Sequence, residues 1–198
     1  EFKNGSIESF LKKNEYDYET LTDEELAEKI ADLIADKKVI GWFQGRMEFG
    51  PRALGSRTII GDARSSDMQK TMNLKIKFRE SFRPFAPSIR AENISDYFEI
   101  GRESPYMLFV ANVQKDKQVK MSEDQNSYFG LEKLNVVRSE VPAVTHVDYS
   151  ARIQSVNKQT NPRYHEMLTK INDKYGCPVV VNTSFNVRGE PIVCTPKD

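Results

Sequence analysis

The sequence predicts an α/β or α+β fold built on one mixed sheet. Short apolar runs with strand character alternate along the chain with segments of helical periodicity. The sequence shows no internal repeat. With 198 residues, 38% of them hydrophobic and 29% charged, the chain has a globular composition and can bury a core. Its sequence contains no apolar run near the roughly 20 residues of a membrane helix, so no membrane partner is expected.

The N-terminal part predicts a lead-in segment followed by a helix. Residues 1–20 are polar and are interpreted as the lead-in. A helix is predicted over residues 21–38, since Thr22 and Glu25 have capping-box spacing. Four apolar side chains recur at helical spacing and are expected to form its buried stripe: Leu26, Ile30, Leu33 and Ile34.

The following stretch predicts two strands around an irregular loop. Residues 39–43 and 58–60 have strand character, and residues 45–57 between them are too rich in Gly, Pro and Arg for a regular element. Residues 65–78 are expected to be helical. Two prolines in residues 83–89 exclude a helix there and favour an edge strand or an extended segment.

The middle of the chain predicts a short helix at residues 91–100 and a strand at 106–113. Residues 114–140 are polar and are expected to form an irregular loop or insertion. Two further strands are predicted at 143–147 and 153–156.

The C-terminal part predicts a helix over residues 162–175, with a proline in its first turn and Gly176 after its end. A buried strand follows at 178–181, and residues 192–193 are expected to form a last strand.

Charge is distributed unevenly, although 29 basic and 29 acidic residues cancel. Residues 1–37 hold eleven acids against five bases, whereas residues 46–90 hold seven arginines and three lysines against four acids. Arginine at this density suits recognition of phosphates or carboxylates, and a solvated basic face is the alternative. The overall balance disfavours a general nucleic-acid binder.

The loop at residues 45–57 is the first candidate binding site. Three of its arginines offer planar guanidinium groups to an anion: Arg46, Arg52 and Arg57. Glu48 is placed to orient one of them through a salt bridge. A purely structural arginine–glutamate loop is the alternative that composition leaves open.

The second candidate site is the run of alternating charges and aromatics at residues 75–87. Lys77 would act there as a point charge for phosphate, and Arg83 is held just before a rigid proline. A surface face whose long side chains keep their charges in water is the alternative.

The third candidate site follows the buried strand at 178–181, at the kind of sheet edge where α/β proteins bind ligands. The amide and hydroxyl groups of Asn182, Ser184 and Asn186 can bind phosphate or sugar oxygens, or they can simply form a turn. Nothing near Ser184 in the sequence completes a nucleophilic triad, so Ser184 is interpreted as a binding residue.

His146 and Asp148 form the remaining polar motif. On a strand, both side chains would point to one face, where they can pair as a base and its orienting group; a structural histidine is the alternative. Two cysteines and two histidines do not predict a metal site, and the low cysteine content fits a reducing cytoplasm.

Four segments resemble, in content and order, the C-terminal domain of the carbamoyltransferases similar to nodulation protein NodU and to the tobramycin and cephamycin carbamoyltransferases. They are GWFQGRMEFGPRALGSRTII, FRESFRPFAP, THVDYSARIQSV and NTSFNVRGEPIV. The resemblance begins near residue 21 and covers nearly the whole chain.

The resemblance implies a YrdC-like α/β domain over residues 21–198, with an open, twisted mixed sheet and flanking helices. Such a domain would bind ATP, with Mg²⁺, and carbamoyl phosphate, and would form carbamoyl adenylate with release of pyrophosphate. A separate N-terminal domain, outside this chain, would contain iron or another metal and pass the carbamoyl group to a hydroxyl acceptor. The chain is thus expected to be the adenylate-forming part of a longer cytoplasmic enzyme.

The resemblance also implies roles for individual residues. Arg52 would bind carbamoyl phosphate, with Arg152, Asn182 and Ser184 around its phosphate and carbamoyl groups. Lys77 and Arg83 would hold the ATP phosphates. Three more cofactor contacts follow only from position within the motifs: Arg46, Arg57 and Asn186. No role is assigned to His146 or Asp148, and no metal ligand is expected in this chain.

Two other functions remain open from the sequence. A YrdC-like fold with a basic concave face would suit double-stranded RNA, and a basic cluster without catalytic function would suit a scaffold for the partner domain. The sequence implies no particular oligomeric state.

Overall fold

The computed structural model describes residues 1–198, except for the side chain of Leu131, and confirms the predicted mixed α/β fold. Six strands form one sheet: β1 (Ile40–Phe43), β2 (Arg57–Asp62), β3 (Ala86–Arg90), β4 (Phe109–Asn112), β5 (Ser150–Val156) and β6 (Val179–Ser184). Seven α-helices accompany them: α1 (Asn4–Lys13), α2 (Asp23–Ala35), α3 (Met68–Lys75), α4 (Ile94–Tyr97), α5 (Glu123–Ser127), α6 (Leu131–Leu134) and α7 (Pro162–Tyr175).

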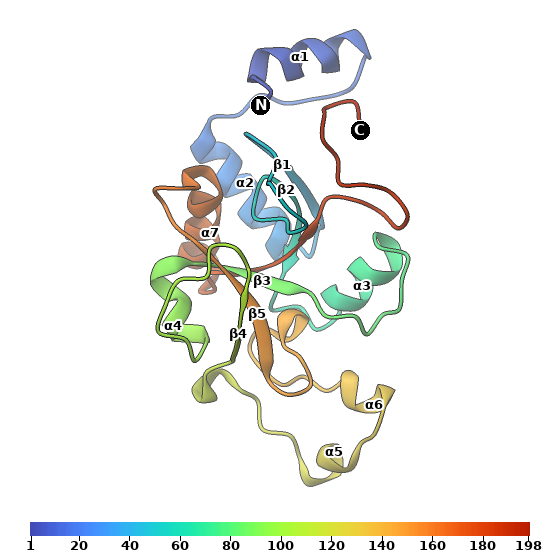
Figure 1. Ribbon diagram of the computed structural model, residues 1–198, viewed down its shortest axis with the longest axis vertical. Coiled ribbons are helices and arrows are strands. Elements are labelled where there is room, and N and C mark those ends of the chain that lie inside the picture. The colour runs from blue at the N-terminus through green and yellow to red at the C-terminus, as the bar shows by residue number, and fades with distance from the viewer.

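The sheet lies at the centre of the molecule with helices around it (Figure 1). It is open and mixed, with the strand order β1-β2-β6-β3-β5-β4. Strands β3 and β5 are parallel, and the other four neighbouring pairs are antiparallel. The C-terminal strand β6 therefore lies in the middle of the sheet, between β2 and β3. This position brings residues near 184 close to loops that come from the first half of the chain.

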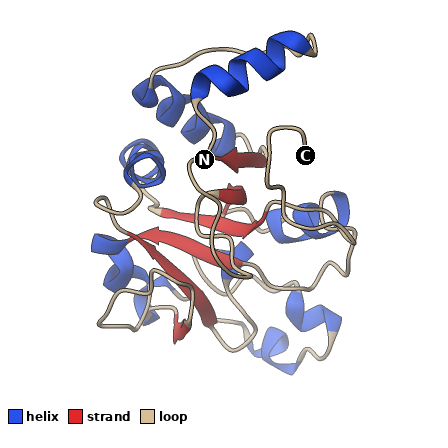
Figure 2. Ribbon diagram, turned by 45° about the horizontal axis from the view of Figure 1, so that its top comes forward, coloured by secondary structure: helices blue, strands red, loops and turns tan.

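Helices cover both faces of the sheet and bury two separate cores (Figure 2). Helices α2 and α7 pack together on one face, where Ile60 and Val180 are buried. Ile59 and Val181, the sequence neighbours of these two residues, are buried on the opposite face with residues of α3 and α4. This alternation is what a strand buried on both sides requires.

The two longest helices begin and end as their sequences predict. Thr22 caps α2 through a complete capping box with Glu25, and Ile30 and Ile34 are buried on its inner face. Leu26 and Leu33 of the predicted stripe are only partly buried, whereas two alanines beside them are fully buried. Helix α7 ends at Gly176, whose φ of 69° is the left-handed conformation that glycine adopts without strain.

The expectation of an edge strand around Pro87 is wrong, because β3 lies between β6 and β5 in the sheet interior. Pro87 pairs with Val181 of β6, but pairing with β5 begins only at Ser88. Pro87 thus has a neighbouring strand on one side only, which explains how a residue without an N–H group is accommodated there.

Two other local expectations are also corrected. Residues 143–147 do not form a strand: a 3₁₀ turn, η3 (Pro142–Val144), is followed by irregular chain. Residues 192–193 are not a strand either, although the Val193 amide donates to the Phe185 carbonyl at 3.0 Å. The lead-in segment contains helix α1, which has no buried residue.

Among the residues that the structure describes, no helix combines the length and the apolar character needed to cross a membrane.

Candidate oxyanion-binding site

Two small cavities adjoin one another at the C-terminal end of β6. The first, of about 190 Å³, is lined by Arg52 from the β1–β2 loop, Arg152 from β5, and Asn182 from β6. The second, of about 270 Å³, is lined by Lys77, Arg83 and Asn186. Three residues line both cavities and join them: Arg79, Thr183 and Ser184. The structure therefore brings seven of the nine predicted site residues together, from four separate segments of the chain.

The first cavity carries positive charge without a counter-charge. Its charged lining residues are Arg52, Arg79 and Arg152, and no carboxylate lines it in the part of the chain that the structure describes. Burial, and then the neighbouring Arg52, lower the pKa of Arg152. Guanidinium groups held together in this way repel one another, and an oxyanion bound between them would relieve that repulsion.

Arg79, like Thr183, is a site residue that sequence reasoning missed. Its Nε donates to Asn73 Oδ1 at 2.6 Å, and its guanidinium lies 4.9 Å from the centre of the Phe85 ring. Burial, and then Arg83, lower the pKa of Arg79. Its place in the charged run with Lys77 was the available signal, but only the fold shows that it lies between the two cavities.

Glu48 shapes the loop that carries Arg52. The expectation was a salt bridge to an arginine, but Glu48 Oε1 accepts hydrogen bonds from three backbone amides instead: Leu54 at 2.7 Å, Ser56 at 2.8 Å and Arg57 at 3.2 Å. The loop also needs a glycine at Gly55, where φ is +101° and a Cβ atom would come within 2.6 Å of the Tyr164 ring. Hydrogen bonds from the loop's backbone amides to Glu48, together with the conformation of Gly55, therefore fix the shape of the loop.

Arg57 lies beneath this loop and lines neither of the two cavities. Its side chain is 1% exposed, and its guanidinium lies 3.5 Å from the centre of the Phe43 ring. Nη1 donates to the carbonyls of Gln44 at 2.7 Å and Ser56 at 3.0 Å. The geometry therefore gives Arg57 a structural role, and the cofactor contact implied for it stays a prediction.

Asn182 connects the sheet to the same loop. Its Nδ2 donates to the Ala53 carbonyl at 2.8 Å and to Gln154 Oε1 at 2.7 Å. Gln154 in turn donates from Nε2 to the Leu54 carbonyl at 2.8 Å. Asn182 Oδ1 is buried and has no hydrogen-bond partner among the described residues. Asn182 thus both lines the first cavity and positions the chain next to Arg52.

Lys77 forms hydrogen bonds with the end of β6 and with the segment that follows it. Its ammonium group donates to the Asn186 carbonyl and to Asn186 Oδ1, both at 2.8 Å, and to the Ser184 carbonyl at 2.5 Å. Ser184 Oγ donates to the same Asn186 Oδ1 at 2.7 Å. Burial, and then Arg79, lower the pKa of Lys77 to about 8. Lys77 therefore holds Ser184 and Asn186 against the second cavity.

The Lys77 side chain is expected to titrate near pH 8, because burial and Arg79 disfavour its charged form. The unfolded chain keeps this proton to a higher pH, so the Lys77 contribution to the free energy of unfolding rises with pH above about 8. An anion bound beside Lys77 would favour the charged form and raise this pKa. A ¹³Cε NMR titration of Lys77, without and with inorganic phosphate, tests both statements; a midpoint well above pH 8 without phosphate, or one that phosphate does not raise, would contradict them.

The remaining predicted residues lie in different surroundings. Arg83 lines the second cavity but is exposed and paired with Glu80 at 3.0 Å. Arg46 is not brought to this site and lies instead beside residues of the N-terminal segment.

His146 and Asp148 do not pair as a general base and its orienting group, the arrangement that was expected if both lay on a strand. Asp148 Oδ1 accepts from the Ser150 amide at 3.0 Å and from Ser150 Oγ at 2.7 Å, and in the described residues no hydrogen bond joins it to His146. Burial lowers the pKa of His146.

These features define an α/β domain with a candidate oxyanion-binding site: two joined cavities lined by arginines and one lysine, with backbone loops fixed around them. Comparison with known proteins identifies its family. The model of the family described as "Carbamoyltransferase C-terminus" matches residues 31–198, and the chain belongs to this family.

Three relatives show how far the similarity extends. A protein of Synechocystis sp. is 57% identical over 201 residues, which covers 100% of this chain and 32% of that protein. Nodulation protein NolO of Bradyrhizobium diazoefficiens is 40% identical over 178 residues, 88% of this chain and 29% of NolO. The 3'-hydroxymethylcephem-O-carbamoyltransferase of Streptomyces clavuligerus is 34% identical over 164 residues, 83% of this chain and 27% of that enzyme. The chain thus spans about a third or less of the length of these relatives.

Proposed function

We propose that this domain binds carbamoyl phosphate and ATP in its two joined cavities and forms carbamoyl adenylate. The observation that carries the proposal is the junction itself: Arg79, Thr183 and Ser184 line both cavities, so two anionic ligands bound there would meet. Membership of the carbamoyltransferase family supports carbamoyl phosphate as one of the ligands.

The first cavity suits carbamoyl phosphate. Its volume of about 190 Å³ fits a molecule of this size, and Arg52 and Arg152 would bind the phosphate oxygens. Ser184 and Asn182 supply smaller polar groups beside these arginines. The second cavity, with Arg83 and the nearby Lys77, would take the phosphates of ATP.

The proposed reaction has two steps. Water adds to the carbonyl carbon of carbamoyl phosphate, the carbon–oxygen bond to phosphate breaks, and carbamate, inorganic phosphate and one proton, released to solvent, result. A carbamate oxygen then attacks the α-phosphorus of ATP, and the bond from that phosphorus to the β-phosphate oxygen breaks to release pyrophosphate. The second step brings two anions together, and Arg79 lies where its charge would offset that repulsion.

Mg²⁺ does not fit a site made by this chain. Glu80 is the one carboxylate lining the two cavities among the described residues, and it is paired with Arg83. The described residues also contain no cluster of three or more metal-ligating side chains. Mg²⁺ would therefore arrive on the phosphates of ATP, as is usual for this ion.

The second half of the reaction is assigned to sequence outside this chain. The relatives are about three times as long or longer, and one is named for transfer of a carbamoyl group to an oxygen. We propose that an N-terminal domain of the same cytoplasmic protein takes carbamoyl adenylate from this domain and passes the carbamoyl group to a hydroxyl acceptor.

Calorimetry tests the two-ligand site. Carbamoyl phosphate and ATP are each expected to bind with one-to-one stoichiometry, and saturating inorganic phosphate should weaken the binding of carbamoyl phosphate, because both place a phosphate between Arg52 and Arg152. If a saturating concentration of either ligand prevents the other from binding, the two cavities do not act as adjoining sites.

A further inference from the structure

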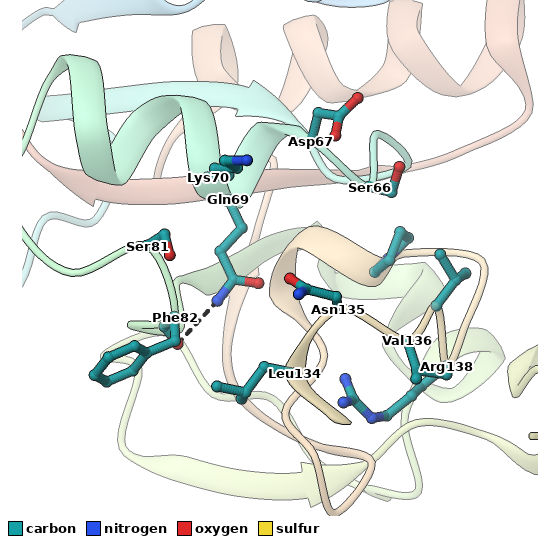
Figure 3. A pocket seen from close by; sticks show the side chains of 12 residues that line it. Ser66, Asp67, Gln69, Lys70, Ser81, Phe82, Leu134, Asn135, Val136 and Arg138 are labelled. Atoms are coloured by element: carbon teal, nitrogen blue, oxygen red, sulfur yellow. Dashed lines mark hydrogen bonds between the residues drawn. The ribbon is translucent and has the colours of Figure 1, made fainter. Parts of the chain in front are cut away.

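A third cavity, of about 460 Å³, lies between the start of helix α3 and residues 134–138 (Figure 3). It shares no lining residue with the two cavities described above. Figure 3 shows the amides of Gln69 and Asn135 pointing toward one another across it, with the Arg138 side chain beside Leu134. The function proposed above does not use any of these residues.

Arg138 is the unusual residue of this cavity. Its side chain is 4% exposed, Nη2 donates to the Lys133 carbonyl, and Nε is buried without a hydrogen-bond partner. Nor does any carboxylate lie within ion-pair distance of it in the described part of the chain. Burial lowers the pKa of Arg138. A guanidinium withdrawn from water is costly unless an anion compensates it, and the described residues supply none.

We propose that this cavity binds a small oxyanion, the phosphate or carboxylate group of a metabolite, with Arg138 as its charge partner. The planar guanidinium matches both groups, because it can donate two parallel hydrogen bonds to a pair of oxygens. The volume is within the range of small-molecule sites. A neutral ligand such as a nucleobase would leave the charge of Arg138 uncompensated.

The two other charged lining residues place the anion. Lys70 and Asp67 both line the cavity and are exposed, and they come from or directly precede α3. Lys70 adds a second positive charge, whereas the Asp67 carboxylate would repel an anion. The oxyanion is therefore expected on the side of Arg138 and Asn135, away from Asp67.

Gln69 links this cavity to the segment that lines the second cavity. Its Nε2 donates to the carbonyls of Phe82 and Arg83, both at 3.1 Å. A ligand in the third cavity would thus touch a residue that holds the backbone of Arg83.

Anion binding in this cavity is tested on the unaltered chain by following NMR resonances of its own lining residues. Inorganic phosphate is titrated in one series and acetate in another, while the Arg138 Nε–H resonance and the Gln69 side-chain amide are followed by ¹H–¹⁵N NMR. A saturable shift of both signals with either anion is expected, and the Arg152→Ala variant should leave it unchanged. A saturable shift with phosphate alone would identify a phosphate site, and with acetate alone a carboxylate site.

The proposal is overturned if neither anion moves the Arg138 signal in a saturable way at concentrations that saturate the Arg52–Arg152 cavity. Arg138→Lys provides a second check, because lysine keeps the charge but loses the planar fork: at least tenfold weaker binding is expected. The exposed Arg102, changed in the same way, is the control and should have no effect. An Arg138→Lys affinity equal to that of the unaltered chain would also contradict the assignment.

Discussion

Replacing Arg152 by alanine is expected to weaken the binding of carbamoyl phosphate about 10- to 100-fold. A hydrogen bond to a charged group contributes about 1.5–3 kcal/mol, and about 1.4 kcal/mol corresponds to a factor of ten in affinity. Arg152 lines the first cavity but not the second, so ATP should bind the variant almost as well as the unaltered chain. Calorimetric titration of each ligand in turn measures both affinities.

The same variant should not be destabilised. Arg152 is held near Arg52, and none of the described residues that line the cavity is a carboxylate, so removing Arg152 relieves repulsion between like charges. Arg102→Ala is the control, because Arg102 is an exposed arginine whose guanidinium lies over Phe109, outside the three cavities. Carbamoyl phosphate binding that falls equally in both variants, or in neither, would show that the first cavity is not the carbamoyl phosphate site.

Replacing Arg57 by alanine is expected to have the largest effect on stability, a loss of about 3 kcal/mol from two charged hydrogen bonds. At about 2–4 °C for each kcal/mol in a chain of this size, the melting temperature should fall by about 6–12 °C. The reason is that Arg57 is 1% exposed and ties the carbonyls of Gln44 and Ser56 together beneath the loop. Thermal unfolding followed by circular dichroism measures the change.

Arg46→Ala is the matched control, since Arg46 is an exposed arginine of the same loop. Exposed substitutions of this kind usually change stability by less than about 0.5 kcal/mol, so its melting temperature should stay close to that of the unaltered chain. If Arg57→Ala keeps its melting temperature but loses ATP, Arg57 contacts the ligand directly and the structural role assigned to it is wrong.

Short sequence patterns correctly predicted the helix caps, which depend on interactions between residues close together in the sequence. The capping box of Thr22 and Glu25 and the left-handed Gly176 depend on neighbours within a few residues, so their sequence patterns were sufficient. The sequence predicts a sheet edge at Pro87, but the sheet interior accepts this proline because pairing with β5 begins one residue later. The start of that pairing is decided by a segment more than 60 residues away.

The same distinction applies to the site. Composition indicated a cluster of arginines for anion binding, and the fold brings most of the predicted residues together. Arg52 and Arg57 are indistinguishable by residue type within one loop, yet one lines a cavity and the other is buried beneath the backbone. The sequence predicts a salt bridge between Glu48 and an arginine, but in the folded loop three backbone amides donate to the Glu48 carboxylate instead. Which side of a loop faces the ligand is a tertiary property that spacing does not encode.

The most direct test of carbamoyl adenylate formation is the exchange of labelled pyrophosphate into ATP by this chain, measured with Mg²⁺ and with or without carbamoyl phosphate. Exchange that requires carbamoyl phosphate, and that is lost in the Arg152→Ala variant but kept in Arg102→Ala, is the predicted result. Exchange that proceeds equally without carbamoyl phosphate, or no exchange when calorimetry shows both ligands bound, would contradict the proposal that the residues of this chain form the adenylate.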